Sequence, residues 1–187
     1  MKLGIGLSRL AVVGIAAVAT AVGSATPAQA GPRPPAVPTT IEVPDGNKVF
    51  LVGHAVGVQI YRCESTPTGF AWGFVAPRAD LYGDNGKLVA THFGGPTWQA
   101  RDGSRVVAQR ADGVTVDATA IAWLLLSTVD TSAGADGDRL IDTTFIQRTA
   151  TSGGVAPATG DCNAATAGSS VEVPYTADYH FWKASGR

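Results

Sequence analysis

The sequence of 187 residues holds few of the side chains from which metal, redox and nucleic-acid sites are built. It has two cysteines, three histidines and one methionine, which is the initiator. Its 14 Lys and Arg residues are balanced by 15 Asp and Glu residues, and they form neither a basic run nor an amphipathic basic helix. Because nucleic acids and anionic membranes attract clustered positive charge, the sequence predicts neither as a partner.

The common catalytic and cofactor motifs are also missing. No Gly-x-Gly-x-x-Gly, P-loop, His-Glu-x-x-His or Gly-x-Ser-x-Gly pattern occurs. The histidines at positions 54, 92 and 180 show no local metal-ligand spacing, so we predict no metal site and no cofactor. An NAD-dependent dehydrogenase is excluded because no nucleotide-binding βαβ unit can be found.

The long apolar run of the sequence lies at its N-terminus. Leu10 to Val22 is too short to span a bilayer comfortably. It follows Lys2 and Arg9 and precedes the small-x-small site Ala28-Gln29-Ala30, so residues 1–30 are predicted to be a secretory signal peptide. The protein is then expected outside the cell or in the cell envelope, in contact with membrane only through the cleaved peptide.

The part after the predicted cleavage site divides into a short leader and one domain. Residues 31–40 contain four prolines and are predicted to be an extended, disordered leader. Residues 41–187 are long enough to form a single domain with its own core. Removal of Lys2 and Arg9 takes two positive charges from a net charge of −1 and leaves −3, which favours solubility.

The two cysteines are predicted to form a structural disulfide. Cys63 and Cys162 would both be exported into an oxidising compartment, where cysteines pair. A catalytic thiol would need surroundings that lower its pKa, and the sequence shows none.

The domain is predicted to consist of short strands separated by turns. Asn85-Gly86 and Asp102-Gly103 predict two-residue type I′ hairpin turns, and the second would pair Trp98 with Val107. The predicted strands are residues 48–52, 57–62, 70–75, 79–83, 87–93, 97–101, 105–110, 114–116, 121–129, 139–148 and 171–182. We predict an all-β fold, an antiparallel β-sandwich or closed barrel of about ten short strands with one disulfide.

Four residues are candidates for a binding site. His92 stands before the tight turn Gly94-Gly95-Pro96 and close to the indole of Trp98. It could be a structural histidine, a ligand contact or a general base. Tyr175 and Asp178 lie in the aromatic C-terminal segment, where exposed rings could stack on sugars or could pack in the core.

Several segments together resemble a family of small secreted bacterial and fungal proteins, family 3455 of the domains of unknown function. The resemblance lies in residues 57–63 (GVQIYRC), 92–98 (HFGGPTW), 123–126 (WLLL), 145–148 with 151–157 (FIQR and TSGGVAP), and 173–179 (VPYTADY). Ala122 and His180 depart from it, where proline and an aromatic residue are usual. Some members carry a malate dehydrogenase label, against which the missing βαβ unit argues.

The resemblance implies no activity, so the hypotheses on function depend on the residues. The leading one is a secreted, non-catalytic binding or envelope-associated module for carbohydrate or a small amphipathic ligand. The alternative is a hydrolase-type enzyme with a site near His92, assisted by Asp178 or Asp80. A third is a structural extracellular protein without a pocket.

Overall fold

The computed structural model describes residue 1 and residues 31–186, so the predicted signal peptide lies outside the described residues apart from Met1. The described part contains eight strands and two single-turn 3-10 helices, and in it no helix is long and apolar enough to cross a membrane. The elements are η1 (Thr39–Ile41), β1 (Asn47–Thr66), β2 (Gly69–Tyr82), β3 (Leu88–Phe93), β4 (Thr97–Ala100), β5 (Arg105–Val114), β6 (Trp123–Ser132), β7 (Thr143–Gly153), η2 (Thr159–Asp161) and β8 (Ser170–Ala184).

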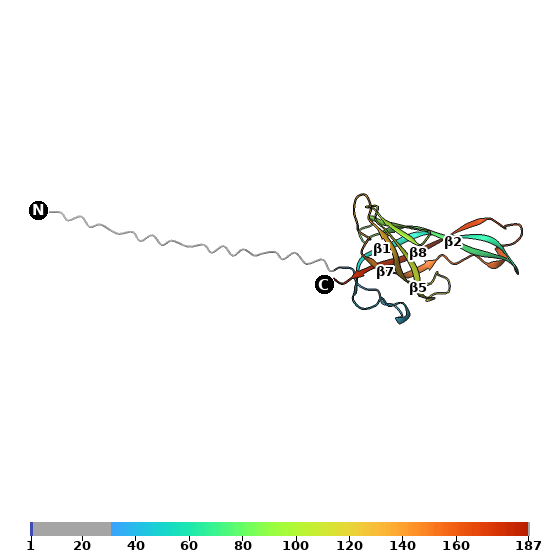
Figure 1. The fold of residues 1–187 in the computed structure, drawn as a ribbon, viewed down its shortest axis with the longest axis horizontal. Coiled ribbons are helices and arrows are strands. Elements are labelled where there is room, and N and C mark those ends of the chain that lie inside the picture. Colours follow the sequence, from blue (N-terminus) through green and yellow to red (C-terminus); the bar gives the residue numbers. More distant parts are fainter. Residues whose placement is uncertain (2–30, 187) are drawn as a thin grey trace. The chain divides into compact units, whose positions relative to one another are not determined.

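The strands form one sheet that closes on itself. Each strand pairs antiparallel with the next along the chain, and β8 returns to pair with β1 (Figure 1). The β1–β8 pairing runs from Asn47 opposite Ala184 to Arg62 opposite Ser170. Closure protects edge strands that would otherwise be open to other chains. The all-β prediction is therefore confirmed, in its barrel form.

The barrel of the described residues has eight strands because some of the predicted short strands are parts of longer ones. The predicted strands 48–52 and 57–62 are both parts of β1, which is 20 residues long and pairs with β8 through the intervening residues 53–56. Likewise, β2 contains the predicted strand 70–75 and most of the predicted strand 79–83, and it continues through Pro77. This proline lies opposite Gln59, at a point where β2 pairs with β1 but not with β3, so its missing N–H costs no ladder hydrogen bond on that side.

The two predicted hairpins occur with longer loops than predicted. Ala100 donates its N–H to the carbonyl of Ser104 (2.9 Å), which gives a three-residue loop with Gly103 in the left-handed region (φ 83°). A three-residue loop of this kind combines a type I turn with a glycine bulge. The hairpin at Asn85-Gly86 has a loop of the same kind. The extra residue shifts the register by one, so Trp98 pairs with Val106.

Inward-facing side chains fill the barrel in alternation along each strand. In β8 the buried residues Tyr175, Ala177, Tyr179 and Phe181 follow at every second position and belong to the core. The core combines large side chains with small ones, mostly alanine, a mixture that is typical of the interior of a small barrel.

A segment before the barrel covers part of its outer surface. Gln147 of β7 donates its side-chain N–H to the carbonyl of Ile41 (2.6 Å), and Ile41 is fully buried. Residues 34–37 lie close to Gln147 and Trp182. The two outward-facing side chains are thereby shielded from water.

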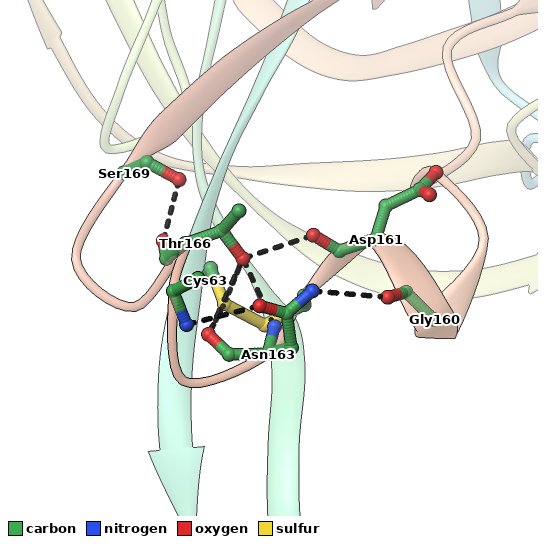
Figure 2. Close-up of a disulfide and its surroundings, with 8 residues drawn as sticks. Cys63, Gly160, Asp161, Asn163, Thr166 and Ser169 are labelled. Atoms are coloured by element: carbon green, nitrogen blue, oxygen red, sulfur yellow. Dashed lines mark hydrogen bonds between the residues drawn. A yellow bond between two sulfur atoms is a disulfide. The ribbon is translucent and has the colours of Figure 1, made fainter.

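The predicted disulfide is present and is embedded in a network of hydrogen bonds (Figure 2). Cys63 of β1 is bonded to Cys162 with an S–S distance of 2.06 Å. The backbone of Cys63 also exchanges hydrogen bonds with Ser169 and Gly168, both at 2.9 Å. The hydroxyl of Thr166 donates to the carbonyl of Asp161 (2.9 Å). The segment between β7 and β8 is thus tied to the end of β1.

Gly57 is expected to be the position in β1 least tolerant of a side chain. A Cβ there would collide with the carbonyl oxygen of Arg78 and with Ala79, which belong to the neighbouring strand. Gly57→Ala should therefore lower the free energy of unfolding by about 2–3 kcal/mol in urea denaturation. Gly53→Ala is the control, because its Cβ would come no closer than 2.9 Å to a neighbouring atom, whereas the Cβ at position 57 would lie much closer to the carbonyl oxygen of Arg78. Equal losses in the two variants would contradict this interpretation.

Candidate functional site

The barrel encloses a cavity of about 480 Å³. All eight strands contribute side chains to its lining, and the turn between β3 and β4 lies at its border. The lining is mostly apolar: among its members are Phe74, Pro77, Leu124, Leu126 and Trp98. The volume lies in the range of sites for small molecules.

The cavity has an opening because β3 and β4 are short. Pairing of β2 with β3 begins at Ala79, and pairing of β4 with β5 ends at Val107. Between these strands the chain crosses in the turn Gly94-Gly95-Pro96, and the carbonyl of Pro96 accepts a hydrogen bond from Ala108 (3.2 Å). Beyond this turn no described strand joins β2 to β5, and the cavity opens there.

His92 and Trp98 border the cavity as a cross-strand pair, and both are buried. Their rings stack with 4.1 Å between centroids and 8° between planes. The Nδ1 atom of His92 lies 2.9 Å from the carbonyl oxygen of Thr97, which can only accept, so Nδ1 carries the proton and Nε2 the lone pair. Burial lowers the pKa of His92 to about 3, so the ring is neutral at physiological pH. The indole N–H of Trp98 has no hydrogen-bond partner among the described residues.

Arg148 brings a positive charge into the barrel. Its Nε and Nη2 atoms donate to one carbonyl oxygen, that of Ala122, at 3.0 and 2.8 Å. Cross-strand pairing places Arg148 next to Tyr179 of β8. Burial raises the pKa of Tyr179, and the charge of Arg148 opposes this rise. The ion pairs of the described residues involve His54 and Arg78, so Arg148 has no carboxylate partner there.

Gln59 is the second polar side chain that faces this space. It is only 3% exposed, and its Nε2 atom makes no hydrogen bond of good geometry in the described part of the chain, although its amide lies close enough to the hydroxyl of Tyr175 to oppose the rise in the pKa of that group. A buried amide without a partner costs free energy, which a ligand with an acceptor atom would recover.

Of the four candidate residues, three lie inside the barrel. His92 and Trp98 line the cavity. Tyr175 lies in the core, where its hydroxyl is 3.3 Å from that of Tyr179. Asp178 lies on the outer face, where its carboxylate binds Nδ1 of His54 (2.7 Å), whose Nε2 binds Asp84 (2.9 Å).

Two residues of the site were not predicted from the sequence: Gln59 and Arg148. A signal for Arg148 was present, because it lies two positions after Ile146, a core residue of the same strand. Alternation along a strand places both on one face, so a lone arginine two residues from a buried isoleucine indicates a charge inside the barrel.

Fold and site define a closed, eight-stranded antiparallel barrel with a cavity that opens through its wall. The family model described as "Protein of unknown function (DUF3455)" matches residues 44–183, and the chain belongs to this family. The predicted resemblance is thereby confirmed. Comparisons with curated proteins and with solved structures gave no match.

Proposed function

We propose that the protein is a non-catalytic extracellular binding module that holds a small amphipathic ligand in the barrel cavity. The observation that carries this proposal is an apolar cavity of about 480 Å³ that contains buried polar groups without partners. Such a combination is typical of small-molecule sites, in which apolar walls supply affinity and a few polar atoms supply orientation. Eight-stranded barrels have room for one small ligand.

Two features support an extracellular location. The charge and apolar pattern of residues 1–30 is that of a secretory signal peptide. The bond between Cys63 and Cys162 is of the kind that persists in oxidising compartments.

A carbohydrate or a hydrolysable substrate finds less support. Trp98 is fully buried, so its ring offers no platform on which a sugar could stack. Hydrolysis at His92 would require the ring to act as a base and a second group to protonate the leaving group, but burial lowers the pKa of His92 to about 3 and no described Asp or Glu lines the cavity.

The proposal is tested with N-phenyl-1-naphthylamine, a neutral amphipathic dye whose fluorescence rises in apolar surroundings. We expect saturable binding with one site per molecule and a Kd in the micromolar range. Leu124→Trp should weaken binding at least tenfold, because Leu124 lines the cavity and the larger side chain would fill it.

The matched control is Val116→Trp. Val116 is 54% exposed and does not line the cavity, so this variant should bind the dye as the wild type does. Absence of saturable binding in the wild type, or equal affinity of both tryptophan variants, would contradict the proposed function.

A further inference from the structure

A second hollow adjoins the cavity, and the two share a set of lining residues. The shared residues are Gln59, Phe74, Arg110, Leu124 and Arg148. Gln59 and Arg148 therefore lie where the two spaces meet, within reach of a ligand that occupies either one.

The charge of this lining has one sign. Arg110 and Arg148 border both hollows, and no described Asp or Glu borders either. A positive charge that is partly removed from water and lacks a counter-ion is unfavourable. A bound anion would compensate it, and the site therefore favours negatively charged ligands.

The donors that face this region suit a carboxylate. The bonds of Arg148 to Ala122 use Nε and Nη2, and a contact with the hydroxyl of Tyr179 uses a third donor, which leaves two of the five N–H donors of the guanidinium for a ligand. A guanidinium binds a carboxylate in a planar, charge-assisted arrangement. The unpartnered Nε2 of Gln59 adds a neutral donor.

The opening of the cavity is apolar. Phe74, Val75 and Val129 line the cavity and are 56%, 54% and 53% exposed. Exposed apolar side chains of this size at the mouth of a cavity favour contact with a hydrocarbon chain.

From these observations we propose that the ligand is an amphipathic carboxylate, a fatty-acid-like anion. Arg148 and Gln59 bind its headgroup, and its hydrocarbon chain lies in the cavity and extends toward the apolar opening. This inference rests on the proposed function and adds the charge and headgroup of the ligand.

The test compares dodecanoate with 1-dodecanol, which has the same chain and no charge, as competitors of N-phenyl-1-naphthylamine. We expect the wild-type protein to bind dodecanoate at least tenfold more tightly than dodecanol. Arg148→Met should reduce this preference to twofold or less. Arg78→Met is the matched control, because Arg78 pairs with Glu172 (2.6 Å) and borders neither hollow, and it should keep the full preference.

A second variant provides a test that does not depend on Arg148→Met folding. Gln59→Glu places a carboxylate of the protein where the headgroup is proposed to bind. It should weaken the binding of dodecanoate at least tenfold more than it weakens the binding of dodecanol.

The outcomes separate this inference from the proposed function. Dye binding with equal competition by dodecanoate and dodecanol in the wild type would overturn the carboxylate proposal and leave the binding module intact. The carboxylate proposal would also be overturned if folded Gln59→Glu or folded Arg148→Met protein preferred dodecanoate over dodecanol as strongly as the wild type does. Absence of dye binding would overturn the proposed function itself.

Discussion

Replacement of both Cys63 and Cys162 by serine is expected to lower the free energy of unfolding by about 4 kcal/mol. The bridge joins residues 99 positions apart, so the unfolded chain without it gains the entropy of a loop that contains six whole strands, β2 to β7. For a loop of about 100 residues the chain-entropy estimate is roughly 4–5 kcal/mol. The hydrogen bonds around Cys63 do not depend on the bridge and should hold the folded geometry.

Urea denaturation of the double variant and of the wild type under non-reducing conditions measures this difference. Wild-type protein that has been fully reduced is the control and should unfold at the same urea concentration as the variant. A loss below about 1 kcal/mol would mean that the unfolded chain gains little freedom when the bridge is removed.

The second large effect is a loss of stability in acid caused by His92. Its pKa is about 3 in the folded protein, because the ring is buried, and about 6.5 in the unfolded chain. Below pH 6.5 the unfolded chain takes up a proton that the folded protein does not bind. Stability from this residue is therefore fully present above pH 6.5 and declines as the pH falls toward 3, by about 5 kcal/mol in total.

The measurement is the dependence of the free energy of unfolding on pH. His92→Phe keeps a ring that can stack on Trp98 but removes the titratable group. The free energy of unfolding of this variant should therefore change less between pH 4 and 6 than that of the wild type, even if the variant is less stable at pH 7. Burial also lowers the pKa of His180, which contributes a loss of the same sign and leaves part of the slope in the variant.

His54 supplies a control with the opposite sign. Hydrogen bonds to Asp84 and Asp178 raise the pKa of His54, so its contribution is fully present below about pH 6.5 and is lost as the pH rises through the raised pKa. His54→Gln should therefore flatten the curve on the alkaline side and leave the acid slope unchanged. An unchanged acid slope in His92→Phe would show that His92 does not resist protonation.

The sequence predicted the features that depend on local pattern or on chemistry. Alternation and turn residues indicated an all-β chain, and β6 was predicted as a strand although its apolar run fits a helix as well. The positions of both hairpin turns were correct, but the loop length was not, because Asp-Gly suits both a two-residue turn and a three-residue loop with a glycine bulge.

The candidate site was predicted only in part. His92 and Trp98 were found because a tight Gly-Gly-Pro turn separates them, and a hairpin places such residues side by side. Asp178 was a candidate because it falls in a predicted strand, whereas most of the aspartates fall in predicted turns. In a strand, however, neighbouring side chains point to opposite faces, and Asp178 lies outside with His54.

What the sequence determined by itself is therefore the type of structure, the disulfide and the family. Only the tertiary structure decided that the sheet closes into a barrel, since closure depends on the pairing of β1 with β8, more than a hundred residues apart. It also decided that Arg148 and Gln59 meet at a cavity, because that space exists where β3 and β4 end before their neighbours. Cavities arise from the relative lengths and registers of strands, and no local pattern of residues encodes them.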